Sequence, residues 1–216
     1  MADHWKEMEK GSMTKIKICG LKRSEDVEMV NEFLPDYVGF VFARSSRQIG
    51  GEQAIYFRKM LDSRIQTVGV FVNADLEEIE ALCSAGAINL VQLHRDETVE
   101  YMDKLYEKIS NPIIKAVRVR SQEQILEAEK LPCSYLLLDT YCKGVYGGSG
   151  TGFDKSLIPA LEKPYFLAGV LSAENICENI RICHPYAVDV SSAVETDGVK
   201  DAEKIKKFIE RVRNNE

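Results

Sequence analysis

The sequence predicts an α/β fold, a single compact (β/α)8 barrel of the TIM type. Eight short apolar segments recur roughly every 20–30 residues, the spacing of a repeated supersecondary unit. Most of them are near-continuous in Val, Ile, Leu and Phe, as in strands that a parallel sheet buries on both faces. Helical patterns fill the gaps, and eight βα units in 216 residues favour a closed barrel. A doubly wound open sheet is the alternative, which the even number of strands disfavours only weakly.

The eight expected strands follow one another at this spacing. They comprise residues 15–19, 37–42, 67–72, 89–94, 113–119, 135–139, 165–168 and 187–191. The first strand alternates apolar and polar residues, and it ends in a thiol and a glycine, Cys19 and Gly20. The sixth ends in a carboxylate, Asp139.

Five of the intervening helices show clear signals. Ser24 is expected to cap the first, with Glu25 and Asp26 in its first turn. Asp75 begins a variant of the capping box before an apolar face, and Gly86 is expected to end that helix.

Three more helices complete these five. Ser121 is expected to open one, and residues 173–183 and 201–213 show apolar residues at helical spacing. Less regular helical patterns cover residues 51–62, 97–109 and 154–161.

Composition limits the class of protein. The chain is long enough for one domain with a full core. Charged residues make up 29% and hydrophobic residues 45%, which is typical of a globular protein in solution. A net charge of −6 argues against nucleic-acid or anionic-membrane partners, and no apolar segment approaches the ~20 residues that span a bilayer. We expect a cytoplasmic monomer or homodimer that binds neither nucleic acid nor membrane.

The N-terminus is expected to be a tail. Residues 1–13 are polar, hold Trp5 and lack the apolar segment of a secretory signal. The Gly11-Ser12-Met13 sequence resembles a cloning junction followed by a second start, and a natural extension is the alternative. The predicted division is a tail of residues 1–13 and a barrel of residues 14–216.

The six cysteines form no C-x-x-C pair, so neither a zinc ribbon nor a thioredoxin site is indicated. They are interpreted as reduced thiols of a cytosolic protein. With only three histidines, no metal site is expected.

Polar residues gather where the predicted strands end, and in a barrel those ends form one rim. Cys19 and Asp139 would then be a candidate base and a candidate acid around one pocket. The simpler interpretations are a buried core thiol for Cys19 and a helix cap or solvated loop residue for Asp139. His94 is either a pocket ligand or a satisfied barrel-mouth histidine.

A phosphorylated small-molecule substrate is favoured by two features. Glycine-rich residues 146–152 follow the sixth strand, and glycines let backbone N–H groups turn toward an anion. A flexible loop is the alternative there. Strands seven and eight end in Leu167-Ala168-Gly169 and Asp189-Val190-Ser191-Ser192, where such barrels often hold a phosphate.

Several motifs in order resemble the phosphoribosylanthranilate isomerase family of tryptophan biosynthesis, from about Lys15 to the last helix. They are KICGL (17–21), GFVF (39–42), SSR (45–47), VGVFV (68–72), VQLH (91–94), LLDT (137–140), GSGTGFD (148–154), VDVSS (188–192), VE (194–195) and GVKD (198–201). The resemblance implies a barrel of the ribulose-phosphate-binding type. It also implies a cofactor-free Amadori rearrangement of N-(5-phosphoribosyl)anthranilate to 1-(2-carboxyphenylamino)-1-deoxyribulose 5-phosphate.

The same resemblance implies roles for individual residues. Asp139 would be the general acid that opens the furanose ring, and Cys19 the general base that removes the C2′ proton. These roles require a lowered pKa for Cys19 and a raised one for Asp139. Arg47 would pair with the anthranilate carboxylate, Asp189 would contact the substrate nitrogen, and His94 would line the pocket. The implied phosphate-binding residues are Gly150, Gly152, Gly169, Val170, Ser191, Ser192 and Ala193.

Three positions depart from the family pattern, which has glycine where Val170, Ala193 and Arg95 stand. We expect strain or displaced loops at Val170 and Ala193, and therefore weaker phosphate binding. Alternative functions are a catalytically silent barrel that binds a phosphorylated metabolite, and a sugar-phosphate aldolase or epimerase. An aldolase needs a lysine at a strand end, whereas Lys115 lies within the fifth strand.

Overall fold

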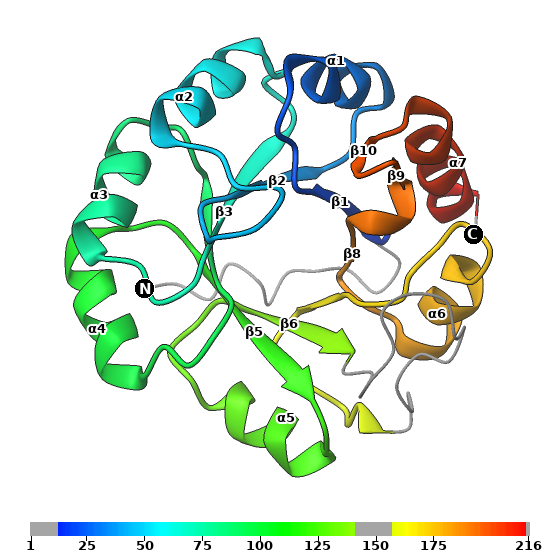
Figure 1. Ribbon diagram of the computed structural model, residues 1–216. Coiled ribbons are helices and arrows are strands. Elements are labelled where there is room, and N and C mark those ends of the chain that lie inside the picture. Colours follow the sequence, from blue (N-terminus) through cyan, green and yellow to red (C-terminus); the bar gives the residue numbers. More distant parts are fainter. Residues whose placement is uncertain (1–12, 141–156, 215–216) are drawn as a thin grey trace.

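In the computed structural model of the protein, which describes residues 13–140 and 157–214, eight parallel strands form a closed barrel (Figure 1). Strand β8 pairs with β1 and completes the ring. The strands are β1 (Lys15–Cys19), β2 (Tyr37–Val41), β3 (Gln66–Phe71), β4 (Leu90–Leu93), β5 (Ile113–Val119), β6 (Tyr135–Thr140), β7 (Tyr165–Leu167) and β8 (Ala187–Val190). The predicted barrel is confirmed and the open sheet is excluded.

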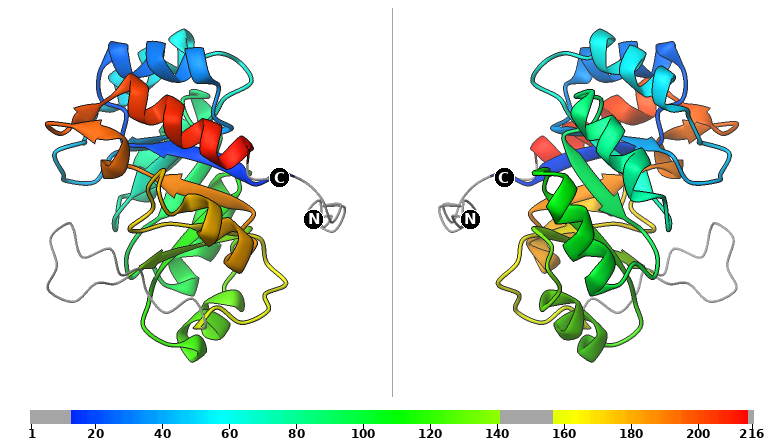
Figure 2. Two further views of the ribbon diagram at one scale, coloured as in Figure 1. Left: turned by 90° about the vertical axis from the view of Figure 1, so that its right-hand side faces the viewer. Right: turned by 90° about the vertical axis from the view of Figure 1, so that its left-hand side faces the viewer.

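Helices surround the barrel on its outer side (Figure 1). Those described are α1 (Ser24–Phe33), α2 (Gly51–Met60), α3 (Leu76–Ser84), α4 (Val99–Lys108), α5 (Gln122–Glu129), α6 (Ile176–Cys183) and α7 (Ala202–Arg213). The last helix, α7, packs against both α1 and α6, so it closes the ring of helices beside the first one (Figures 1 and 2). None of these helices is long and apolar enough to cross a membrane.

Helix capping was predicted only in part. Ser121, which was expected to open its helix, caps α5 through its side-chain oxygen, and Asp201, for which no cap was predicted, caps α7 in the same way. The expected Ser24 cap is wrong: Ser24 is the first helical residue of α1, and the carboxylate of Asp26 instead accepts the backbone N–H of Arg23 at 3.1 Å. Asp75 does precede α3, but its side chain makes no capping bond, so the expected capping box is wrong.

Two further expected helices differ from the structure. The helix expected over residues 173–183 begins only at Ile176. Of the segment 154–161, residues 157–161 are described, and they contain no α-helix. The predicted tail of residues 1–13 lies almost wholly outside the described residues, so the division into tail and barrel stays a prediction.

The core has two layers, because alternate residues of each strand point outward to the helices and inward to the barrel axis. Toward the strand starts the inner layer is apolar and is closed by aromatic rings. There the Tyr37 and Tyr186 hydroxyls lie 2.7 Å apart, and Phe166 packs edge-on against both rings. Burying each such large side chain contributes roughly 1.5–3 kcal/mol. With this end filled, a cavity has room only at the carboxyl ends of the strands.

A buried ion pair fixes the loops at that rim. The Lys115 ammonium of β5 lies 2.6 Å from the carboxylate of Glu97, and it also donates to the carbonyl of Arg95. Glu97 in turn accepts the backbone N–H groups of Asn73 and Arg95, at 3.0 and 2.9 Å. Burial opposes the charge of Glu97, but Lys115 and these N–H groups lower its pKa overall. One carboxylate therefore ties the loops after β3 and β4 to β5.

Replacing Glu97 by Gln should leave the Lys115 ammonium buried without a counter-charge and lower the free energy of unfolding by about 3 kcal/mol. Urea denaturation at pH 7 measures this, with the exposed Glu100→Gln as the matched control. Because the folded pKa of Glu97 is lowered, its stabilisation is present above the unfolded pKa of about 4.3 and is lost as the pH falls through the folded value. The native protein and Glu97→Gln should therefore approach equal stability as the pH falls below about 4.3 and through the lowered pKa of Glu97. Equal losses in Glu97→Gln and Glu100→Gln would contradict the prediction.

Candidate active site

A cavity of about 940 Å³ opens at the carboxyl ends of the barrel strands. Its walls include all five residues predicted for acid–base chemistry and substrate contact: Cys19, Arg47, His94, Asp139 and Asp189. The structure therefore brings together side chains from five strand ends, as the barrel topology predicts. The described phosphate-site candidates also line this cavity, namely Gly169, Val170, Ser191, Ser192 and Ala193. Gly150 and Gly152 lie outside the described residues.

Cys19 is the last residue of β1, and its position is set by the neighbouring strand. Gly39 of β2 faces it so closely that a Cβ at residue 39 would lie 2.5 Å from the Cys19 Sγ. Burial raises the pKa of the thiol, and the ammonium of Lys17 offsets only part of that effect. The expectation of a lowered Cys19 pKa is therefore wrong for the protein without substrate, because the site removes water from the thiol.

Beneath the thiol lies a fully buried ammonium group, Lys17 of β1. Its Nζ donates to Gln92 Oε1 at 2.7 Å and to Asp189 Oδ2 at 2.9 Å. Burial opposes the charge of Lys17, but Asp189 and Cys19 raise its pKa overall. The other oxygen of Asp189, Oδ1, is buried and has no hydrogen-bond partner among the described residues. Sequence analysis missed Lys17 and Gln92, although a lysine between Ile16 and Ile18 of a buried strand was a detectable signal.

His94 is held from one side and faces Asp139 on the other. Gln92 Nε2 lies 2.8 Å from His94 Nδ1, and His94 Nε2 lies 3.9 Å from Asp139 Oδ2. Burial, together with the positive charges of Lys17 and Arg118, lowers the pKa of His94 to about 4. The imidazole is therefore neutral at pH 7, and its contact with Asp139 is not a pairing of opposite charges.

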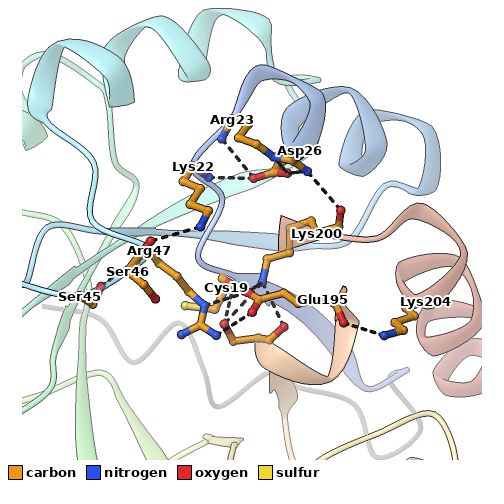
Figure 3. Close-up of polar contacts among 11 residues, drawn as sticks. Cys19, Lys22, Arg23, Asp26, Ser45, Ser46, Arg47, Glu195, Lys200 and Lys204 are labelled. Atoms are coloured by element: carbon orange, nitrogen blue, oxygen red, sulfur yellow. Dashed lines mark hydrogen bonds and ion pairs between the residues drawn. The ribbon is translucent and has the colours of Figure 1, made fainter. Parts of the chain in front are cut away.

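Arg47 lies beside Cys19 in a network that Figure 3 shows. Its Nε and Nη2 donate to the two oxygens of Glu195, both at 2.7 Å, which is the bidentate geometry of a guanidinium and a carboxylate. The buried Lys200 ammonium donates to the same carboxylate at 2.7 Å. Burial opposes the charge of Glu195, but Arg47 and Lys200 lower its pKa to about 2.

A short hairpin delivers Glu195 and Lys200 to the site. Strands β9 (Glu195–Thr196) and β10 (Val199–Lys200) pair antiparallel, and Asp197 and Gly198 make the turn at φ 52° and 75°. Sequence analysis gave Glu195 and Lys200 no role in the site, because only the fold shows that the hairpin reaches Arg47. Among the described residues, no three His, Cys, Asp or Glu side chains are grouped to hold a metal ion.

Comparison with known proteins decides the family. The model of the family "N-(5'phosphoribosyl)anthranilate (PRA) isomerase" matches residues 16–211. A curated isomerase of that name from Lachnoclostridium phytofermentans is 48% identical over 208 residues, covering 90% of this chain and 95% of the relative. The chain belongs to the phosphoribosylanthranilate isomerase family.

Solved phosphoribosylanthranilate isomerases share the whole barrel. The structure from Thermotoga maritima aligns with a TM-score of 0.82 at 37% identity, covering 94% of this chain and 100% of that one. A second isomerase, in complex with reduced 1-(o-carboxyphenylamino)-1-deoxyribulose 5-phosphate, aligns with a TM-score of 0.78 at 34% identity and the same coverage.

The three departures from the isomerase pattern have different consequences. Val170 holds a left-handed φ of 32° directly after Gly169 at φ 76°, so the expected strain is present there. Ala193 lies in the short 3-10 helix η2 (Ser192–Val194) and has no positive φ, so the expectation of strain at Ala193 is wrong. Arg95 also has no positive φ, and its backbone is bound by Glu97 and Lys115.

Gly39→Ala should displace the Cys19 thiol. To reach an ordinary contact, Sγ must move by roughly 1 Å from the added Cβ, and a shift of that size can cost about 10²-fold in turnover. A crystal structure locates Sγ, and isomerase assays give kcat. Gly50→Ala is the matched control, because a Cβ at Gly50 would have no neighbour within 4 Å. Unchanged kcat with a displaced Sγ would show that the position of the thiol does not limit turnover.

Proposed function

We propose that this protein catalyses the Amadori rearrangement of N-(5-phosphoribosyl)anthranilate to 1-(2-carboxyphenylamino)-1-deoxyribulose 5-phosphate, in tryptophan biosynthesis. The observation that carries the proposal is one cavity lined by both Cys19 and Asp139, in a chain of this isomerase family. A solved relative in complex with a reduced form of that product supports the same substrate class. We also propose that the protein is cytoplasmic and that it is a monomer or a homodimer.

Asp139 is proposed as the general acid. Its side chain lies at the end of β6 and is about a quarter exposed, so a substrate in the cavity can reach it. A proton from Asp139 to the furanose ring oxygen breaks the bond between that oxygen and C1′. The ring opens, and the nitrogen lone pair forms the protonated Schiff base.

Cys19 is proposed as the general base for the second step. Its raised pKa in the free protein leaves mostly thiol at pH 7, so the thiolate must form in the complex. The positive charge of the protonated Schiff base favours the thiolate and makes the C2′ proton more acidic. Cys19 takes that proton, the C2′–H electron pair forms the C1′=C2′ double bond, and the π electrons of C1′=N return to nitrogen. The resulting enolamine tautomerises to the ketone.

The remaining contacts are proposed to position the substrate. Glu195 occupies Nε and Nη2 of Arg47, which leaves the Nη1 edge of that guanidinium for the anthranilate carboxylate. Asp189 Oδ1, buried and without a partner among the described residues, is suited to accept the substrate N–H. His94 lines the pocket between Gln92 and Asp139.

The phosphate is proposed to bind at the ends of β7 and β8. The described candidates are Gly169, Val170, Ser191, Ser192 and Ala193, all of which line the cavity. An aldolase is disfavoured, because the amine of Lys115 is bound to Glu97 and the Arg95 carbonyl.

Cys19→Ser should keep the fold and lower kcat by about 10²–10⁴-fold, because a hydroxyl is a far weaker base. The assay follows the loss of fluorescence of freshly made phosphoribosylanthranilate. Cys83→Ser, which changes a half-buried thiol on α3, is the matched control. Native-like turnover in Cys19→Ser would remove the thiol from the mechanism. Binding of the reduced product without any turnover in the native chain would favour the silent barrel.

Val170→Gly should lower KM with little change in kcat. Releasing the strain of a β-branched residue at φ 32° recovers about 1–3 kcal/mol, and each 1.4 kcal/mol that reaches binding is tenfold in affinity. Ala193→Gly is the control, because its backbone already has an ordinary φ and its KM should not change. Equal KM values for the native chain and Val170→Gly would show that the loop already presents its N–H groups to the phosphate.

A further inference from the structure

A line of buried polar groups crosses the barrel beneath the cavity. Asp189 on β8 accepts from Lys17 on β1 at 2.9 Å, Lys17 donates to Gln92 on β4 at 2.7 Å, and Gln92 lies 2.8 Å from His94. Lys17 and Gln92 are 0% and 1% exposed, so water does not compete for the contact between them. The line ends at His94 Nε2, 3.9 Å from Asp139.

The donors and acceptors along this line are determined by chemistry. An ammonium group only donates, so Gln92 must turn its carbonyl oxygen toward Lys17. The amide nitrogen of Gln92 then faces His94 Nδ1, and because that nitrogen donates, Nδ1 must accept. A neutral imidazole carries one proton, which is therefore on Nε2, the nitrogen that faces Asp139.

The charges around the His94 ring also favour its neutral form. Burial and the positive charges of Lys17 and Arg118 lower the pKa of His94, and the carboxylates of Asp189 and Glu97 only partly oppose them. A second proton would have to enter at Nδ1, where it would point at the Gln92 N–H instead of an acceptor. Geometry and charge both favour a neutral His94 ring with its proton on Nε2.

We propose that Lys17, acting through Gln92, is the positioning residue that keeps His94 neutral with its proton on Nε2, facing Asp139. The consequence for catalysis rests on the proposed function. An imidazolium beside Asp139 would stabilise the carboxylate form and so lower the fraction of Asp139 that holds the proton needed to open the furanose ring. A neutral ring offers an N–H dipole without that charge, so Asp139 can hold its proton until the substrate binds.

Nitrogen NMR of the full chain labelled with ¹⁵N-histidine tests the tautomer directly, with His94→Gln to assign the signals. At pH 7 the native ring should be neutral and protonated on Nε2. In Gln92→Glu the new carboxylate accepts from Nδ1, so the proton should move to Nδ1 or the ring should become doubly protonated. Gln66→Glu, an exposed glutamine at the start of β3, should leave the spectrum unchanged.

A native ring protonated on Nδ1, or charged at pH 7, would overturn the proposal, even if Gln92→Glu does not fold. An unchanged His94 spectrum in folded Gln92→Glu would also overturn it, because Gln92 would then not direct the proton.

Turnover tests the consequence separately. Where Gln92→Glu carries a doubly protonated His94, each unit by which that charge lowers the pKa of Asp139 removes about tenfold of the protonated fraction of Asp139, so kcat should fall about tenfold or more. KM should change little, and the alkaline limb of the pH profile of kcat should move to lower pH. If the native protein gives the expected spectra but has no isomerase activity, the proposed function is refuted while the proposed state of the His94 ring stands. A doubly protonated His94 with unchanged kcat in Gln92→Glu would refute the effect on Asp139.

Discussion

One buried ammonium group, Lys17 Nζ, determines how the side chains beneath the cavity are arranged. Burying an isolated charge costs several kcal/mol, so the fold must supply close partners. Asp189 stands directly opposite Lys17 in the register of β8 against β1, and Gln92 reaches it from β4 across the barrel. Below this layer the interior is apolar, and above it lies the cavity. The barrel closure and the polarity of the site therefore depend on the same three side chains.

The charges around the thiol suit an anionic substrate. Lys17, Arg47 and Lys200 provide three cations against the two carboxylates of Asp189 and Glu195, so these five groups together carry one positive charge. Each cation already has a protein carboxylate, which fixes its position before a ligand arrives and reduces reorganisation on binding. Such a preorganised wall can hold a substrate carboxylate without leaving any of these charges unpaired in the free protein.

The rim loops are fixed by side chains that bind backbone groups. Glu97 accepts two backbone N–H groups and the Lys115 ammonium, and the β9–β10 hairpin is held by Lys200, which also donates to the Ser191 carbonyl at 3.1 Å. Such bonds let a loop keep its shape without glycine. Ala193, in η2, has no positive φ, whereas Val170, which follows a left-handed glycine, has one although Asn175 donates to its carbonyl at 2.8 Å.

The sequence alone determined the barrel, the start of α5 at Ser121, and the meeting of strand ends at one rim. Apolar periodicity and helix capping act between near neighbours in the chain, and parallel closure places every strand's carboxyl end on the same side. Only the tertiary structure decided the direction of the Cys19 pKa shift, the site's buried ion pairs and the tautomer of His94. The partners of Lys17 lie 75 and 172 residues away, and that of Arg47 lies 148 residues away. Desolvation and charge pairing depend on what surrounds a group in space, and no local pattern encodes that.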